Sequence, residues 1–278
     1  MAMPVALERM DLPSTAWTFL SNLRDMAPVI QCITNFVSMD LVANSVISVG
    51  ASPAMVHSME EIPDFIQNVH ALYINVGTIS HEWLHAMGLA AELASKFGKP
   101  WILDPVAAGI SLFRLNACLD LIEKKPTVIR GNASEIISIN HGCVGAAKGV
   151  DSCQGSGDAI SAAKNLARSS GAIVAVSGAT DIVTNGELVI GVHNGVPMMQ
   201  KITATGCAVT ALIAAFVATD PPHPLEATVS ALSVFGVAGE LGMDKSDGPA
   251  SLRVHMIDSL YGLDEAAFLS RSKISIIP

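Results

Sequence analysis

The sequence has few charged residues and no excess of basic ones. Only 15% of its 278 residues are Asp, Glu, Lys or Arg, and 50% are hydrophobic, so it lacks the polar, charge-rich composition of a disordered chain. Its 16 basic residues are outnumbered by 25 acidic ones, which gives a formal net charge of −9. Because nucleic-acid binding needs a basic stripe, this balance argues against a nucleic-acid partner, although one local Arg and a helix N-terminus suffice for a small anion.

Long apolar runs are also lacking. The most apolar run, Ala208 to Ala218, is shorter than the ~20 residues that a bilayer-spanning helix needs, and Asp220-Pro221-Pro222 follows it, as at the end of a buried helix. The N-terminal stretch from Met1 to Trp17 has neither the basic start nor the long apolar segment of a signal peptide. We therefore expect a cytoplasmic protein with no membrane partner.

Cysteine pairs and nucleotide-binding glycine motifs are missing too. The five cysteines include no CxxC pair: they are Cys32, Cys118, Cys143, Cys153 and Cys207. An odd, scattered set argues against a disulfide framework or a zinc ribbon and favours a reducing compartment. The sequence contains no Walker A motif and no G-x-G-x-x-G after a strand, so neither of these phosphate-binding loops is present.

What the sequence does contain is a regular alternation of short apolar runs with amphipathic stretches. The runs expected as strands are Val29–Thr34, Ala71–Val76, Trp101–Leu103, Thr127–Ile129 and Ile173–Ser177. The stretches expected as helices are Asp40–Val49, Glu82–Phe97, Ser111–Lys124 and Asp158–Ser169. The runs do not alternate between polar and apolar residues, which is typical of a parallel sheet covered on both faces. The pattern predicts right-handed βαβ units in a three-layer α/β/α fold with a mainly parallel central sheet.

The later part of the sequence departs from this alternation. Asn-Gly occurs at 185–186 and again at 194–195, and both pairs are hairpin signals, so we expect antiparallel strands at one edge of the sheet. The segment from Gly206 to about Ser270 is expected to be mostly helical. Because no repeat or linker interrupts the sequence, we predict a single domain over residues 1–278.

A literal zinc-protease motif occurs at His81-Glu82-Trp83-Leu84-His85. Two His one helical turn apart can share Zn²⁺, and the Glu can polarise water. Gly88 extends the match, but Ala91 stands where the longer form of the motif has its third His. The alternative interpretation is a surface helix that begins after Ser80 and carries both His on its outer face. We prefer the surface helix and keep a zinc metalloprotease as an alternative from another enzyme class.

A second candidate is the segment Thr203-Ala204-Thr205-Gly206-Cys207, which leads directly into the most apolar stretch of the sequence. Free backbone N–H groups at such a helix start, together with the helix dipole, can form an anion hole. Cys207 falls in the first turn of that helix, where we expect its thiolate to be stabilised. A buried helix capped by Thr, with a small packing cysteine, is the alternative.

Polar residues at the ends of the expected strands form a third candidate site. They are Asp104, Arg130, Asn132 and Ser177. In open α/β sheets, ligands bind at the carboxyl ends of the strands. Glu135 lies three residues after Asn132, so this pair can either cap a helix or hold Mg²⁺ through the carboxylate. A carboxylate, an Arg and an anion hole at one sheet edge together fit phosphoryl transfer.

Ordered motifs over nearly the whole chain resemble the hydroxyethylthiazole kinase family, a ribokinase-like group that acts in thiazole salvage for thiamine synthesis. The motifs are Gln31-Cys-Ile-Thr-Asn35-Phe-Val, Gly50-Ala-Ser-Pro-Ala-Met55, Asn75-Val-Gly-Thr, Leu103-Asp104-Pro-Val, Ile129-Arg130-Gly-Asn-Ala-Ser-Glu135 and Thr205-Gly-Cys207. The resemblance implies a ribokinase-like fold and Mg²⁺- and ATP-dependent phosphorylation of the primary alcohol of 4-methyl-5-(2-hydroxyethyl)thiazole. It also implies a homotrimer with active sites between subunits.

The same resemblance implies a role for each matching residue. The catalytic residues would be Thr205, Gly206 and Cys207, the substrate-binding residues Met55, Asn35 and Ala204, the ATP-binding residues Arg130, Ser177 and Asn132, and the metal-organising residues Asp104 and Glu135. Cys207 takes the place of the aspartate base of most ribokinase-like kinases, and we expect it mainly to position the hydroxyl.

One position departs from the family pattern, which reads Thr-Gly-x-Gly-Cys at this segment. Ala204 stands at the first Gly of that pattern. Contact between its backbone and the substrate is retained if φ is negative, whereas a left-handed conformation would strain an alanine.

Three further functions remain as alternatives. The first is a ribokinase-like kinase of another small heterocyclic alcohol. The second is a cysteine-nucleophile enzyme using Cys207, which needs a His partner, and His193 is the nearest His in the sequence. The third is a non-catalytic binding protein, which should lack the anion-hole Gly or the strand-end acid. Gly206 and Asp104 are both present.

Overall fold

A computed structural model describes residues 11–145 and 155–278, with the side chains of residues 155 and 156 left out. Within these residues, nine strands form one sheet in the order β2-β1-β3-β4-β5-β6-β7-β8-β9. The strands are β1 (Val29–Ile33), β2 (Ser52–Ala54), β3 (Ala71–Asn75), β4 (Trp101–Asp104), β5 (Val128–Asn132), β6 (Ile173–Ser177), β7 (Asp181–Thr184), β8 (Val189–Val192) and β9 (Ile274–Ile276). The pairs from β2 to β6 are parallel, and those from β6 to β9 are antiparallel. The predicted mainly parallel sheet with antiparallel edge strands is confirmed.

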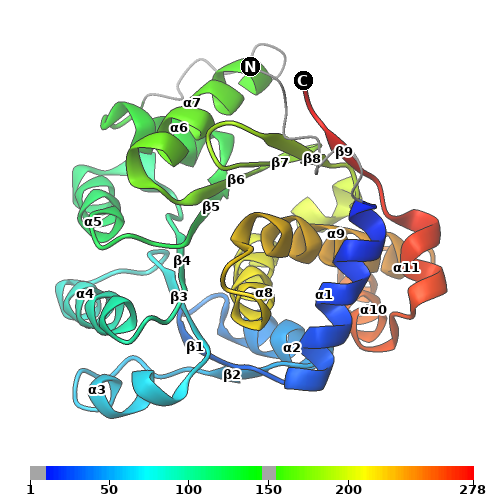
Figure 1. The fold of residues 1–278 in the computed structure, drawn as a ribbon, viewed down its shortest axis with the longest axis horizontal. Coiled ribbons are helices and arrows are strands. Elements are labelled where there is room, and N and C mark those ends of the chain that lie inside the picture. The colour runs from blue at the N-terminus through cyan, green and yellow to red at the C-terminus, as the bar shows by residue number, and fades with distance from the viewer. Residues whose placement is uncertain (1–10, 146–154) are drawn as a thin grey trace.

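Helices cover both faces of the sheet (Figure 1). One layer contains α3 (Ile62–Phe65), α4 (His81–Lys96), α5 (Leu112–Ile122), α6 (Ala133–His141) and α7 (Gly155–Ser170). The opposite layer contains α1 (Leu12–Met26), α2 (Met39–Val49), α8 (Thr205–Thr219), α9 (Pro224–Met243), α10 (Pro249–Gly262) and α11 (Glu265–Arg271). Short 3-10 turns occupy Ile66–Asn68, Ala108–Ile110 and Pro197–Lys201. The three-layer α/β/α prediction is confirmed.

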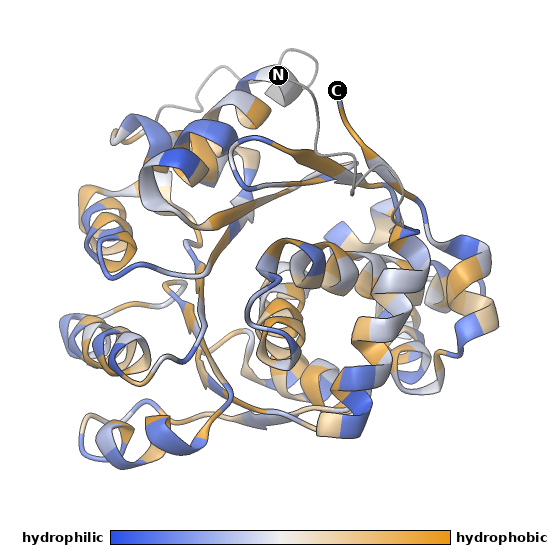
Figure 2. Cartoon of the chain, viewed as in Figure 1, coloured by the Kyte–Doolittle hydropathy of each residue, from blue (hydrophilic) through white to orange (hydrophobic). Residues whose placement is uncertain are grey.

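Successive side chains of the central strands enter two separate hydrophobic cores. In β3, Tyr73 belongs to the core under α8 and α9, whereas Leu72 and Ile74 belong to the core under α4 and α5. Because side chains alternate between faces and both faces are buried, every residue of β3 is buried. This burial explains why the sequence runs are uniformly apolar, and the central strands are accordingly coloured largely orange in Figure 2.

The antiparallel edge differs from the prediction in one respect. The Asn185-Gly186 pair lies between β7 and β8, and Gly186 takes the positive φ of +97° that such turns favour. The Asn194-Gly195 pair makes no hairpin: the chain passes from it into the 3-10 turn Pro197–Lys201, and β8 pairs instead with β9. The hairpin prediction at 194–195 was therefore wrong, because the partner of β8 comes from the C-terminal end of the sequence.

Helix α8 is the apolar helix expected after Gly206, and every residue from Ala208 to Ala218 is buried in it. Helix α9 is long and apolar enough to cross a membrane, but 83% of its apolar window is buried inside the protein. Both helices pack in the same core. Their hydropathy is therefore accounted for by burial in the fold.

Cysteines in the described residues are all free: Cys32 and Cys118 are buried, Cys143 is exposed and Cys207 is half-buried. Cys153 lies outside the described residues, as does the first part of the stretch from Met1 to Trp17.

Candidate active site

The start of α8 lies at the centre of the candidate site. Ala204 precedes the helix with φ +67° and ψ 9°, and no side chain caps the helix. Thr205 Oγ1 turns back to donate to the carbonyl groups of Met199 and Ile202, both at 3.3 Å. The Thr-capped alternative is therefore wrong, and the first backbone N–H groups of α8, which have no intrahelical partner, keep the anion-binding character expected of a helix start.

Arg130, at the centre of β5, lies against this helix start. A Cβ built on Gly206 would stand 2.7 Å from Nη1 of Arg130, so the guanidinium occupies the space that only a glycine leaves free. Its Nη2 donates a hydrogen bond to Ser177 Oγ at the end of β6, and its Nε has no partner within the described structure although it is buried. A buried Arg with unused donor capacity suits phosphate oxygens.

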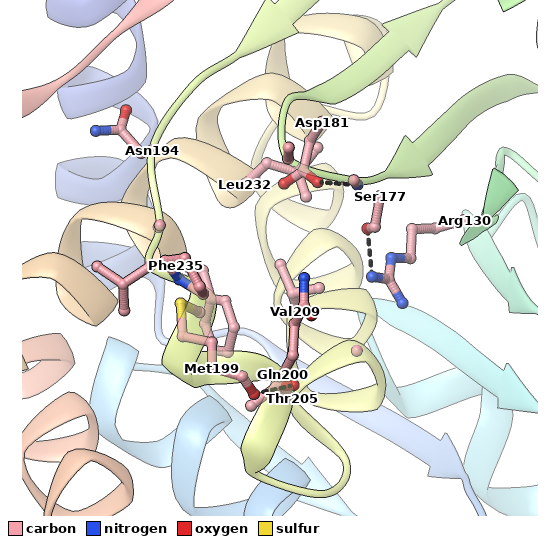
Figure 3. A pocket seen from close by; sticks show the side chains of 17 residues that line it. Arg130, Ser177, Asp181, Asn194, Met199, Gln200, Thr205, Val209, Leu232 and Phe235 are labelled. Carbon is pink, nitrogen blue, oxygen red and sulfur yellow. Dashed lines mark hydrogen bonds between the residues drawn. The ribbon is translucent and has the colours of Figure 1, made fainter. Parts of the chain in front are cut away.

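Arg130, Ser177, Thr205 and Gly206 line one cavity of about 260 Å³ (Figure 3). Its polar side also contains Asp181, whose Oδ1 accepts the N–H of Gly178 at 3.0 Å. Burial raises the pKa of Asp181 above its ordinary value, although the N–H of Gly178 and the charge of Arg130 act in the opposite direction. The remaining wall is largely apolar: it includes Val196, Pro197, Met199, Val209, Leu232 and Phe235. A polar end beside an apolar wall fits a ligand with a phosphate and a flat base.

Asp104, at the end of β4, is buried and does not line the Arg130 cavity. Its Oδ2 accepts hydrogen bonds from Tyr73 at 3.2 Å, Asn75 at 2.9 Å and Thr210 at 3.0 Å. Burial raises the pKa of Asp104 to about 6, with Arg130 opposing the rise and the charge of Glu135 adding to it. The Asp104 carboxyl group is therefore hydrogen-bonded by neutral donors, and its pKa depends on the charges of both Arg130 and Glu135.

Glu135 and Asn132 form the capping box that their spacing allowed. Asn132 Oδ1 accepts the N–H of Glu135 at 3.0 Å, and Glu135 Oε2 accepts the N–H of Asn132 at 2.7 Å. Glu135 Oε1 accepts the N–H of Ala107 at 2.8 Å, which ties the start of α6 to the loop after β4. Both residues line a second cavity, of about 750 Å³, and not the one that contains Arg130. The structure thus separates Asn132 from the other two predicted ATP-binding residues.

The thiol of Cys207 faces away from the Arg130 cavity, toward two asparagines. Its sulfur lies 3.4 Å from Nδ2 of Asn35 and 3.3 Å from Nδ2 of Asn75. Burial and the nearby Asp104 raise the pKa of Cys207, although both amides act in the opposite direction. The expectation of a stabilised thiolate was therefore wrong, because desolvation outweighs the effect of the helix start.

Asn35 and Met55 lie just after the neighbouring strands β1 and β2. The Asn35 side chain is buried and engaged with Val37, Ser38, Asn75 and Cys207. Met55 follows β2 and packs, partly buried, against the core under α8, and it does not line the Arg130 cavity. Sequence reasoning assigned no role to Asn75, Thr210, Tyr73 or Asp181, although Asn75 and Asp181 occupy strand ends.

The His81–His85 motif lies on the surface. Ser80 caps α4 by accepting the N–H of Trp83 at 3.2 Å, and both His side chains are exposed. In residues 11–145 and 155–278, no group of three His, Cys, Asp or Glu side chains is placed to hold a metal ion. The surface-helix interpretation is confirmed.

Comparisons with known proteins identify the family to which this chain is similar. The model of the hydroxyethylthiazole kinase family matches residues 20–266. A hydroxyethylthiazole kinase of Arabidopsis thaliana is 60% identical over 96% of this chain and 97% of its own, and one of Rhizobium rhizogenes is 47% identical over 94% and 97%. The solved structure of the hydroxyethylthiazole kinase protein from Pyrococcus horikoshii OT3 has a TM-score of 0.88 and 35% identity over 95% of this chain and 100% of its own. The pyridoxal kinase from Staphylococcus aureus is similar in fold alone, with a TM-score of 0.61 at 15% identity.

Proposed function

This chain belongs to the hydroxyethylthiazole kinase family, and from that membership and its site we infer the reaction that it catalyses. It transfers a phosphoryl group from ATP to the primary alcohol of 4-methyl-5-(2-hydroxyethyl)thiazole, a salvage step of thiamine biosynthesis. The observation that carries this proposal is the contact of Arg130 with Gly206 at the uncapped start of α8, inside the cavity of about 260 Å³. An Arg fork and free helix N–H groups converge there on one anion-sized space.

We propose direct in-line transfer across the helix start. ATP lies on the side of Arg130, Ser177 and Asp181, and the thiazole alcohol lies on the side of Cys207, Asn35 and Met55. Arg130 donates to the phosphate oxygens, and the N–H groups of residues 205–207 receive the migrating group. A loose transition state is stabilised chiefly by such positioned donors and needs little help from a base.

Cys207 is suited to positioning the hydroxyl. Because the pKa of Cys207 is raised, its side chain is a neutral thiol at neutral pH. A neutral thiol can contact the substrate hydroxyl without taking the proton of that hydroxyl. The φ of Ala204 is +67° and not negative, so we propose that its backbone contributes to the same wall in the strained left-handed conformation. We propose that Asn132 acts at the rim of the nucleotide site through the loop that it caps.

The family resemblance implies Mg²⁺, and the acids at the end of β4 and in the first turn of α6 fit it. Asp104 and Glu135 supply the hard carboxylate oxygens that Mg²⁺ prefers, and the charge of Glu135 contributes to the raised pKa of Asp104. Two acids that repel each other in this way are stabilised by a nearby dication. We propose that these residues hold Mg²⁺ together with nucleotide phosphates, where it would neutralise phosphate charge.

We also propose a homotrimer with active sites between subunits. Supporting it, the segments that follow β1 and β4 expose large apolar side chains: Phe36 and Val37 after β1 are 67% and 63% exposed, and Ile110 and Leu112 after β4 are 76% and 67% exposed. Sedimentation at low micromolar protein tests this, and a clean monomer refutes it. Val37→Lys should weaken the assembly, whereas Val254→Lys on α10 serves as the exposed control.

We propose that the chain forms a single domain over residues 1–278, which the single sheet supports. We propose that it acts in the cytosol.

The test of the function is ADP release from Mg-ATP with and without the thiazole alcohol, with mass detection of the product. We expect thiazole-dependent ADP release and a product heavier by one phosphoryl group. Arg130→Met should lower kcat/KM at least a hundredfold. Arg253→Met, which removes only a surface ion pair with Asp40, should leave kcat/KM within twofold of the wild type. Turnover only with pyridoxal or a pyrimidine alcohol would keep the mechanism and change the substrate, and no turnover with any alcohol would favour a binding protein.

A further inference from the structure

The Asn75 side chain, at the end of β3, bridges the acid and the thiol of the site. Its Nδ2 lies 2.8 Å from the Tyr73 hydroxyl, 2.9 Å from Oδ2 of Asp104 and 3.3 Å from Sγ of Cys207. These contacts join β3 to β4 and to the start of α8 through one buried amide. Within the described residues, no other side chain forms hydrogen bonds with both Asp104 and Cys207.

The orientation of this amide is determined by the backbone. The N–H of Gly77 donates to Oδ1 of Asn75 at 2.9 Å. Because a backbone N–H can only donate, the atom that it meets must be the carbonyl oxygen of the amide. The NH₂ group therefore points to Asp104 and Cys207.

Asn35 is oriented in the same way from the other side. Its Oδ1 accepts the N–H groups of Val37 at 3.0 Å and Ser38 at 3.1 Å. Its NH₂ group is thereby turned to Oδ1 of Asn75, at 2.8 Å, and to the sulfur of Cys207. Two amide NH₂ groups, each fixed by backbone donors, thus converge on one sulfur atom.

The number of hydrogens on Asn75 allows these contacts to coexist. The NH₂ group has two hydrogens and meets three acceptors. Two of these acceptors, the Tyr73 hydroxyl and Oδ2 of Asp104, lie only 3.2 Å apart, so one hydrogen can be shared between them. The second hydrogen is then available to Cys207.

We propose that Asn75 is a positioning residue for phosphoryl transfer, acting through Cys207. With Asn35, it fixes the sulfur as a hydrogen-bond acceptor and holds it at a constant place relative to Asp104, so that the substrate hydroxyl meets a sulfur of one orientation. This inference rests on the proposed function. It adds a residue that touches neither ATP nor the migrating phosphoryl group.

Asn75→Asp is the decisive variant, because the carboxylate keeps an oxygen for Gly77 and Asn35 but has no NH₂ group for Cys207. We expect kcat to fall at least tenfold while the KM for ATP stays within twofold. We also expect alkylation of Cys207 by iodoacetamide, followed by mass spectrometry of its peptide, to slow at least fivefold. A residue that only supports the loop would leave both the alkylation rate and kcat near those of the wild type.

Three controls make the test specific. Tyr73→Phe removes one of the other two acceptors of the Asn75 amide and should leave the alkylation rate within twofold, and Asn44→Asp makes the same chemical change on the exposed face of α2. In a Cys207→Ala background, Asn75→Asp should cost no further kcat, because the group through which it acts is gone. Asn75→Ser serves if thermal melting shows that the Asp variant does not fold.

The outcomes separate this inference from the function. Unchanged alkylation and kcat in folded Asn75→Asp overturn the role of Asn75, as does a full further loss of kcat in the Cys207→Ala background. A wild-type protein that phosphorylates no thiazole alcohol contradicts the proposed function, and the alkylation rates still decide whether Asn75 holds the thiol.

Discussion

The guanidinium of Arg130 and the backbone of Gly206 are in direct contact, with Nη1 only 2.7 Å from where a Cβ of residue 206 would stand. Gly206 has no positive φ, so its role is to leave space and not to allow an unusual conformation. We predict that Gly206→Ala displaces Arg130 and lowers kcat/KM for ATP at least tenfold, with little change in folding. Steady-state kinetics measure this effect.

Gly88→Ala is the matched control for this variant. Gly88 lies in α4, where an added Cβ meets only Cε of Lys124 at 3.7 Å. Because Ala is the better helix former, this change should stabilise the protein by up to about 1 kcal/mol and leave the kinetics unchanged. Equal kinetics in both Ala variants would contradict the proposed role of the Arg130 contact.

Ala204 has a φ of +67°, so it adopts the left-handed conformation that strains an alanine and that the sequence alone could not establish. Ala204→Gly removes this strain, so we predict a gain of about 1 kcal/mol in the free energy of unfolding, measured by urea denaturation. Ala27→Gly, at the left-handed end of α1, should give a similar gain without affecting the KM for the alcohol. A loss of stability in Ala204→Gly would show that the alanine methyl group makes contacts worth more than the strain.

Asp104 should make the protein less stable as the pH rises from about 4 to 6. Burial raises its pKa from 3.8 to about 6, so in this range the folded protein holds a proton that the unfolded chain has lost. Its contribution to stability is fully present below the unfolded pKa and is lost as the pH rises through the folded pKa.

The measurement is Tm against pH in EDTA for the wild type and Asp104→Asn. The Tm of the wild type should fall by several degrees relative to that of the variant between pH 4 and 6, and the difference should then stay constant. Asp64→Asn, on the exposed side of α3, should keep the wild-type profile. A wild-type Tm that rises against Asp104→Asn over this range has the wrong sign for a raised pKa.

Arg114 holds two loops of the site together. Its Nη1 donates to the carbonyl groups of Val76, Gly77 and Val106, which follow β3 and β4. Hydrogen bonds from a charged donor are worth about 1.5–3 kcal/mol, so we predict that Arg114→Met lowers the free energy of unfolding by about 2 kcal/mol. Arg253→Met, which loses a surface ion pair, should cost less than about 1 kcal/mol, and similar costs in both variants would refute the clamp.

His81 and His85 should have no part in the reaction. Protein purified without added zinc is predicted to contain zinc far below one ion per chain, and His85→Ala should keep the kcat of the wild type. Metal analysis and the ADP assay measure these values. If the wild type contains one zinc ion per chain and His85→Ala loses it, the zinc metalloprotease alternative would be supported.

The sequence predicted the central strands well, because uniformly apolar, β-branched runs are the direct result of burial on both sheet faces. It missed β2 and β9, which have three residues each and acquire their strand conformation by pairing with β1 and β8. Helix α1 was also missed, although Ala16, Phe19, Leu20 and Leu23 follow the helical spacing that could have found it.

The candidate site was predictable where local rules apply. The capping box of Asn132 and Glu135 and the surface helix after Ser80 follow from short-range patterns. The surroundings of Cys207 did not follow, because Asn35 and Asn75 lie 172 and 132 residues away in the sequence. The direction of its pKa shift depends on burial by these distant segments, and the helix start was the only contribution visible in the sequence.

Helix α8 joins the anion-binding turn to a segment in which every residue from Ala208 to Ala218 is buried. The turn is therefore joined to the part of the molecule that opens last: the hydrogen-bonded amides of residues 208–218 should exchange with deuterium only when the whole core opens, whereas the free amides of the turn itself should exchange quickly. On heating, catalytic capacity and native structure should disappear along one curve, without an interval of folded but inactive protein. Adaptation of such an enzyme to cold would then have to come from its peripheral loops, because the catalytic turn cannot be loosened separately from the core.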